Sequence, residues 1–172
     1  MAPLGTQPMT NPITDIPDLH GEMWIPFAPT PKGRPRLSKY GGAFTPRRTR
    51  EAEHFIRDYV KYHNVIKEPI PYPLAISVRF FFKGKTTAYH AIRPDLDNCL
   101  KLLLDSLGPH YYTYLGVKTL AKGLLYCDDC QVVSVMADKY IHPIQGIWVR
   151  WRTVQYPFTV KHPLESECQK SV

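Results

Sequence analysis

Hydrophobic residues alternate with other side chains over Leu74–Lys83, which is the pattern of a strand that buries one face. Similar alternation predicts strands near 23–27, 132–141 and 147–155. The turn at Pro143–Gly146 lies between the last two runs and predicts that they pair as an antiparallel hairpin.

Two other segments repeat their hydrophobic residues at helical spacing. The first, near 47–63, has an apolar stripe with polar residues opposite. The second, near 95–107, starts at Asp95, a residue type that caps helices well. Residues 115–122 are also compatible with one or two helical turns. These elements predict an α+β fold: a single domain in which helices cover a small mixed sheet.

The chain of 172 residues is long enough for one domain with a core of its own. Residues 1–20 contain four prolines and no periodic pattern, so we expect a flexible leader there. Periodicity is lost again after Tyr156, which predicts a flexible tail over 157–172 and a folded domain over 21–156. The most apolar run, 74–82, is too short to span a bilayer, and no secretory signal is evident. We therefore expect a soluble, intracellular protein that does not bind membranes.

The net charge of +7 favours a polyanionic partner. Much of the excess lies in one segment, 32–50, which has seven basic residues and no acidic one. Its Gly and Pro content predicts a loop that follows a phosphate backbone, with Tyr40 or Phe44 stacking on bases or wedging between them. The plainer alternative is a solvated, disordered loop. The DNA-contacting candidates in this loop are Lys32, Arg34, Arg36, Tyr40 and Phe44.

Four cysteines raise the question of a zinc site, because Cys127 and Cys130 have metal-ligand spacing. A structural zinc module would use this pair with Cys99 and a histidine. However, the chain contains one such Cys pair, and no pair of histidines at ligand spacing follows it. The sequence therefore disfavours a zinc module.

Carboxylates mark the start of the second predicted helix. Asp95 and Asp97 are one residue apart, and Lys101 follows Asp97 at the i, i+4 distance that places both side chains on one helix face. A purely structural interpretation is available: Asp95 caps the helix, Asp97 benefits from the helix dipole, and Lys101 forms a surface ion pair.

The combination of motifs favours a functional interpretation. The segments RPDLDNCLK at 93–101 and YCDDCQVV at 126–133, together with the basic loop upstream, resemble the RusA family of Holliday junction resolvases. The resemblance extends over about residues 22–141. It implies a crossover junction endodeoxyribonuclease that acts as a homodimer on four-way DNA junctions in recombination and repair, in a prokaryotic or phage cytoplasm.

The resemblance also assigns roles to residues. It implies that Asp95, Asp97 and Asp129 are catalytic metal ligands, and that Lys101 stabilises the transition state or orients the water. Three carboxylates suit Mg²⁺, or Mn²⁺ as a substitute. Asp128 is the weaker candidate, because the resemblance implies that the second Asp of the pair carries the catalytic role. On the strand expected there, neighbouring side chains point to opposite faces. Arg93 is suited to gripping the scissile phosphate, or to neutralising the carboxylates.

Two alternatives to this function stay open. One is a nuclease for other branched DNA. The other is a non-catalytic, basic DNA-binding protein, although such a protein has no need of carboxylates placed among phosphates. The segment 108–123, with its three tyrosines, is longer than the family pattern and could serve the DNA surface or the dimer contact.

Overall fold

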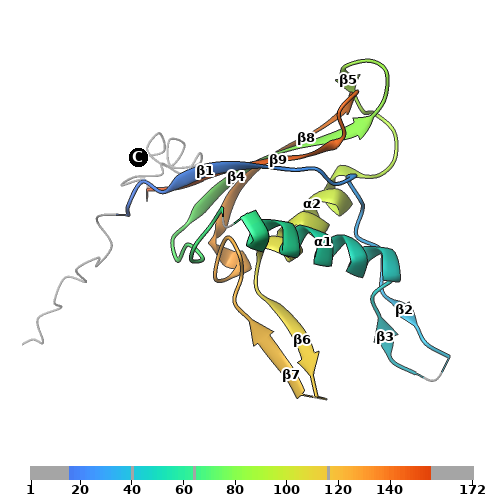
Figure 1. Ribbon diagram of the computed structural model, residues 1–172, viewed down its shortest axis with the longest axis vertical. Coiled ribbons are helices and arrows are strands. Elements are labelled where there is room, and N and C mark those ends of the chain that lie inside the picture. The colour runs from blue at the N-terminus through green and yellow to red at the C-terminus, as the bar shows by residue number, and fades with distance from the viewer. Residues whose placement is uncertain (1–15, 40, 64, 116, 156–172) are drawn as a thin grey trace, which may run out of the picture.

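The computed structural model describes residues 16–39, 41–63, 65–115 and 117–155. Within these residues a mixed sheet has the strand order β1-β9-β4-β8-β5, and two helices lie on one side of it (Figure 1). The sheet strands are β1 (His20–Ile25), β4 (Leu74–Lys83), β5 (Ala88–Tyr89), β8 (Val132–His142) and β9 (Gly146–Thr153). The helices are α1 (Arg47–His63) and α2 (Leu96–Leu107). This arrangement confirms the predicted α+β fold.

Two short hairpins project from this body on the same side of the molecule (Figure 1). The first pairs β2 (Arg36–Leu37) with β3 (Ala43–Phe44), and the second pairs β6 (His110–Tyr114) with β7 (Val117–Ala121). A 3₁₀ turn, η1 (Asp129–Gln131), leads into β8. Both hairpins carry exposed apolar side chains, among them Leu37, Phe44, Tyr111 and Val117.

The central strand β4 organises the core. It pairs antiparallel with β9 and parallel with β8, so both of its edges are satisfied. Its alternate residues Leu74, Ile76, Val78 and Phe80 are at most 1% exposed and face the helices. The sides of α1 and α2 that bury Ile56, Val60, Leu102, Leu103 and Leu107 pack over them. The predicted strand 74–83 and helix 47–63 are confirmed, and the second helix begins one residue after its cap, Asp95.

The structure shows which face of β9 is buried. Ile147, Val149 and Trp151 enter the core, whereas Arg150 and Arg152 lie on the face of the sheet opposite the helices. Strand alternation alone requires this separation once one face is packed.

The predicted hairpin between 132–141 and 147–155 is wrong. Strands β8 and β9 flank β4 and do not pair with each other, because the short connection after His142 crosses the end of β4. The sequence pattern between the two alternating segments correctly predicted a turn, but it did not predict which strands pair with each other. The strongly apolar β4 takes the central place, where both of its edges are paired.

The possible helix at 115–122 is also wrong, since this region forms the β6–β7 hairpin. Tyrosine and threonine make up four of the five residues of β6, and β7 contributes a valine and a threonine; these residue types favour strands over helices. Only two residues connect β6 to β7, and the first of them, Leu115, has a positive φ of 48°. Local strand propensity therefore prevailed over a weak helical spacing.

The folded domain begins earlier than the predicted boundary at residue 21. Ile16 is 4% exposed, and the Pro17 carbonyl accepts a hydrogen bond of 2.6 Å from Thr153 Oγ1. The rest of the predicted leader and the tail at 157–172 lie outside the described residues. In the part of the chain that the structure describes, no helix is both long and apolar enough to cross a membrane.

A core truncation should reveal how much the helix layer contributes. Leu103→Ala removes a fully buried side chain under the sheet and should lower the free energy of unfolding by about 2–5 kcal/mol. Urea denaturation measures this change. Leu37→Ala is the control, because Leu37 is 83% exposed and its loss should change stability by no more than about 0.5 kcal/mol. Equal effects of the two substitutions would contradict this description of the core.

Candidate active site

The segment before α2 is held in place by a lysine of the sheet. Lys139 Nζ donates hydrogen bonds to the carbonyls of Ile92 and Pro94, at 2.9 and 2.6 Å. These contacts attach the segment 92–94 to the far end of β8 and fix where α2 begins. Asp95 occupies the N-cap position.

The Asp95 carboxylate is available for more than capping. Its side chain makes no capping hydrogen bond to the helix backbone and accepts only a long contact of 3.5 Å from Asn98 Nδ2. Asp97 lies in the first helical turn and is exposed, as is Lys101 one turn later. The predicted placement of both carboxylates at the helix start is therefore correct. No ion pair between Asp97 and Lys101 is formed among the described residues, so the surface-pair interpretation lacks support.

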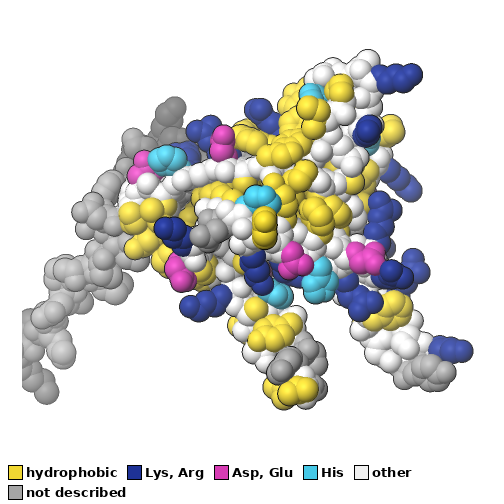
Figure 2. Space-filling view, in the orientation of Figure 1, with side chains coloured by type: hydrophobic (Ala, Val, Ile, Leu, Met, Phe, Trp, Pro, Cys, Tyr) yellow, Lys and Arg dark blue, Asp and Glu magenta, His cyan; other side chains and the backbone are white. Residues whose placement is uncertain are grey.

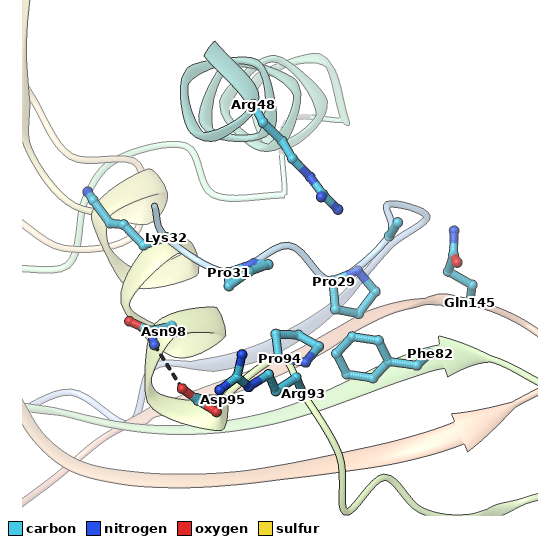
Figure 3. A pocket seen from close by; sticks show the side chains of 11 residues that line it. Pro29, Pro31, Lys32, Arg48, Phe82, Arg93, Pro94, Asp95, Asn98 and Gln145 are labelled. Carbon is cyan, nitrogen blue, oxygen red and sulfur yellow. Dashed lines mark hydrogen bonds between the residues drawn. The ribbon is translucent and has the colours of Figure 1, made fainter. Parts of the chain in front are cut away.

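Asp95 lines a cavity of about 680 Å³ (Figure 3). The cavity lies between the segment 28–32, the start of α1 and the start of α2, and the side chain of Arg48 reaches into it from α1. Arg93 lies beside Asp95 at its floor. Two guanidinium groups beside a carboxylate suit a phosphodiester, because arginine binds phosphate through paired hydrogen bonds. The structure brings Arg93 and Asp95 together as predicted.

Several residues of this cavity have no recognisable signal in the sequence. Arg48 is one of seven basic residues in the segment 32–50, and only tertiary packing brings the start of α1 to the same cavity as the Asp95 motif. Phe82 and Gln145 come from distant parts of the chain and carried no local signal. The remaining lining residues include Pro29, Pro31, Pro94 and Asn98.

The basic segment is joined to the site through its backbone. Lys32 N donates to the Asn98 carbonyl in α2 at 2.9 Å, and Gly33 N donates to Thr49 Oγ1 in α1 at 3.0 Å. From this attachment the chain passes the exposed Arg34 and enters the β2–β3 hairpin, whose exposed side chains include Arg36 and Phe44. Tyr40 lies outside the described residues. Figure 2 shows dark-blue side chains gathered along the edge of the molecule that carries this hairpin.

Lys32 has a structural role that the sequence did not predict. Its ammonium contacts the carboxylates of Asp105 in α2 and, at 3.0 Å, Glu53 in α1. Partial burial lowers the pKa of Lys32, but the two carboxylates outweigh this effect and hold that pKa above its ordinary value. Arg57 joins the same cluster, with its guanidinium 3.7 Å from Glu53 and donating to the Asp105 carbonyl. Lys32 thus fastens the basic segment to both helices.

Asp129 lies at the opposite end of α2. A Cβ added to Gly108, just past the last helical residue, would lie 2.8 Å from Asp129 Oδ1, so glycine is needed there for close approach. The buried Tyr126 hydroxyl donates to the Leu104 carbonyl at 2.7 Å nearby. Burial, and next the charge of Asp129, raise the pKa of Tyr126 above its ordinary range.

The prediction that Asp128 and Asp129 lie on a strand is wrong, since they form the 3₁₀ turn before β8. Asp128 caps this turn by accepting a hydrogen bond of 2.9 Å from Cys130 N. Hydrogen bonding to the Cys130 thiol, and next to the Cys130 backbone N–H, lowers the pKa of Asp128. Asp128 therefore has a capping role. Asp129 follows it as the first residue of the turn.

One copy of the chain does not bring the three predicted metal ligands together. Helix α2 has 12 residues, so at a rise of about 1.5 Å per residue its ends are about 18 Å apart. Asp95 and Asp97 are at one end and Asp129 is at the other. Within the described residues, no three His, Cys, Asp or Glu side chains are grouped closely enough to hold a metal ion. That finding also gives no support to the zinc module, whose Cys99 is buried in the core.

Comparison of the sequence with known protein families shows which family the chain belongs to. The model of the family described as Endodeoxyribonuclease RusA matches residues 26–114, just over half of the chain. The chain belongs to the RusA endodeoxyribonuclease family. No curated protein gives a significant match.

Membership makes this RusA-family protein a DNA endonuclease, in agreement with the Holliday junction resolvase predicted from the sequence. The matched region contains the basic hairpin and the Asp95 motif. It ends before Asp129, whose role therefore rests on the Asp-Asp motif of the sequence.

The ion pairs of Lys32 predict a measurable contribution to stability. Lys32→Met removes the ammonium that Glu53 and Asp105 share and leaves Arg57 as the remaining cation of the cluster. It should lower the free energy of unfolding by about 1–2 kcal/mol, a value reduced for partial solvent screening. Chemical denaturation measures it. The exposed Arg34→Met is the matched control and should have little effect.

The same substitution should also loosen the basic segment, because Lys32 is the side-chain anchor at its start. Limited trypsin digestion should then cut between Arg34 and Arg48 faster in Lys32→Met than in the unmodified protein. Unchanged stability together with unchanged digestion would show that the ion pairs do not hold the segment.

Proposed function

We propose that this protein resolves four-way DNA junctions during recombination and repair, by nicking two opposed strands with Mg²⁺ or Mn²⁺ as cofactor. The observation that carries the proposal is the cavity at the start of α2, which is joined to a basic hairpin. In it Asp95 lies beside Arg93, and Arg48 reaches in from α1 on the other side. We also propose a cytoplasmic location, since that is where a prokaryotic or phage DNA substrate lies.

Each part of the site has a chemical task in this proposal. Asp95, Asp97 and Asp129 would hold the metal ion, because hard carboxylate oxygens without imidazole or thiolate are the donors that Mg²⁺ and Mn²⁺ prefer. When bound, the ion would activate water and polarise the scissile phosphate. Arg93 and Arg48 would bind the phosphate through paired hydrogen bonds. The exposed ammonium of Lys101 would stabilise the added negative charge of the transition state.

The separation of the carboxylates supports a homodimer. Two copies related by a two-fold axis can place Asp129 of the partner subunit beside Asp95 and Asp97, and the same operation completes the second site. Two equivalent sites are what a junction needs if two strands are to be cut. The homodimer is thus part of the proposed chemistry.

The outer edge of β8 is the surface best suited to this dimer. The short strand β5 pairs with β8 only at Tyr140 and Ile141, which leaves the edge of residues 132–138 without a strand partner in the described chain. Val135 and Met136, which point to opposite faces of the sheet, are 40% and 59% exposed. An open edge with apolar side chains on both faces is a surface for strand pairing.

Antiparallel pairing of two such edges would support the shared site. The strand β8 begins just after Asp129 and reaches Lys139, which holds Pro94 next to Asp95. In a symmetric antiparallel pair, the start of one β8 lies beside the end of the other. Asp129 of the partner subunit would therefore approach the end of β8 where Asp95 lies.

Neutralising any one carboxylate should abolish cleavage. Asp95→Asn, Asp97→Asn and Asp129→Asn should each slow nicking of a four-way junction in Mg²⁺ about a hundredfold or more, because each removes a metal ligand. Junction binding should persist or tighten, since a charge that repels phosphate is lost. Gel assays of a labelled junction, a flap and a linear duplex, with Mg²⁺ or with EDTA, measure both properties.

Asp128→Asn is the matched control, because its carboxylate caps a turn and is not a proposed ligand. It should retain most of the cleavage. Near-normal nicking by one of the three key variants would remove that residue from the site, and faster cutting of the flap than of the junction would favour a nuclease for other branched DNA.

Mixing two inactive variants should restore activity if the site is shared between subunits. In a dimer of one Asp97→Asn chain and one Asp129→Asn chain, one site loses both altered ligands and the other keeps all three natural carboxylates. Such mixed dimers, purified through two different tags, should nick a plasmid-borne cruciform once and give nicked circles in place of linear product.

Each variant alone should give neither product, which provides the control. A mixed dimer as inactive as its parents would show that each site is built within one chain. Full activity of a monomeric protein would refute the dimer itself.

A further inference from the structure

The β6–β7 hairpin, called here the arm (His110–Ala121), exposes an unusual amount of apolar surface. Tyr111, Leu115, Val117 and Leu120 are 62, 86, 64 and 56% exposed. Figure 2 shows yellow side chains along it, well away from the body of the molecule. These residues contribute little to the core, so their apolar surface points to a partner.

The positive charge of the arm indicates that its partner is a polyanion. No acidic residue occurs between Asp105 and Asp128, whereas Lys118 and Lys122 lie on or beside the second strand of the arm. Lys118 Nζ lies 4.4 Å from the centre of the Tyr111 ring, so a cation and an aromatic ring share one face. Aromatic and apolar side chains with lysines and no carboxylates suit stacked bases flanked by phosphates.

Leu115 at the tip supplies an independent observation. It has a φ of 48°, a left-handed conformation that glycine or asparagine adopts at much lower cost, and its side chain is 86% exposed. The backbone of this turn thus favours another residue type, and burial in the chain does not explain the leucine. An apolar side chain at the end of a narrow two-stranded ribbon can enter between base pairs and unstack them.

The position of the arm agrees with a DNA partner. It leaves the body directly after Gly108, close to the Asp129 carboxylate, and it projects on the same side as the basic β2–β3 hairpin (Figure 1). The β2–β3 hairpin has a similar composition, with exposed Leu37 and Phe44 in the same hairpin as Arg36 and Lys39. DNA bound between the two hairpins would therefore meet both.

We propose that the arm is a second DNA-contacting element, which inserts Leu115 at the branch point of a junction while Tyr111 stacks on an exposed base and Lys118 contacts the backbone. The proposal rests on the proposed junction substrate and deepens it: the arm would recognise the branch, where bases are less tightly stacked than in a duplex. Recognition of branched over linear DNA would then depend on the arm, whereas cutting depends on the carboxylates.

Binding measured without cleavage tests the arm separately from the nuclease. A four-way junction with 2-aminopurine at the branch point is titrated in EDTA, and a linear duplex of the same sequence is titrated in parallel. The unmodified protein should raise the fluorescence as bases unstack. Tyr111→Ala combined with Leu115→Ser should remove this rise and weaken junction binding about tenfold or more, with less than about a twofold change on the duplex.

Two further variants complete the comparison. Lys118→Ala should reduce the slope of log affinity against log salt by about one, as expected for one lost phosphate contact. Leu19→Ser, which alters an exposed leucine beside β9, is the matched control and should leave junction binding and fluorescence unchanged. Because the arm residues are exposed, the double variant should keep the thermal unfolding midpoint of the unmodified protein.

Unchanged fluorescence and junction affinity in the double variant would overturn the proposal. An equal loss on junction and duplex would also overturn it, since the arm would then contact only the backbone. Conversion of a dimer to a monomer in sedimentation velocity would show that a second copy occupies the arm. A protein that unstacks the junction through its arm yet cuts nothing in Mg²⁺ would refute the nuclease and leave the arm in place.

Discussion

A straight helix cannot bring its own ends together, and this constraint governs the site. The buried side of α2 packs against the sheet, so the helix is neither bent nor movable without loss of the core. One end carries Asp95 and Asp97, and the other is closed by Gly108 against Asp129. The separation that follows is set by the peptide geometry of the helix and not by the conformation of a loop. Any chemistry that needs all three carboxylates must therefore be built by more than one copy.

The charged residues have two separate roles: some form ion pairs that stabilise the packing of the helices, and others are exposed and can bind DNA. Glu53 and Asp105 are used inside, where they neutralise Lys32 and Arg57 at the junction of the two helices. The basic side chains beyond that point, on the β2–β3 hairpin, have no acidic neighbour in their own segment. The protein thus fixes the start of a basic segment by ion pairs and leaves Arg34 and Arg36 exposed, where they can face a polyanion.

Local patterns predicted the elements well, and non-local contacts explain most of what they missed. The alternation of Leu74–Lys83 and the helical spacing of 47–63 correspond to β4 and α1 residue for residue, because burial of one face imposes those periods. The choice of neighbouring strand is not encoded in such a local pattern, and the predicted pairing of β8 with β9 was therefore wrong. The motif around Asp95 placed the carboxylates correctly at a helix start. Arg48 and Gln145 entered the cavity through packing between segments far apart in the chain, and the distance to Asp129 became visible only once the fold was known.

The open edge of β8 has a consequence for how the proposed activity would be controlled. If one of the three carboxylates of each catalytic centre must come from another copy, then a newly made chain cannot cut DNA by itself. Activity at low protein levels would rise with the square of concentration, so a few stray molecules would cut almost nothing while a modest increase in expression would switch cutting on. Strand pairing at one sheet edge would in this way protect cellular DNA from cleavage when the protein is scarce.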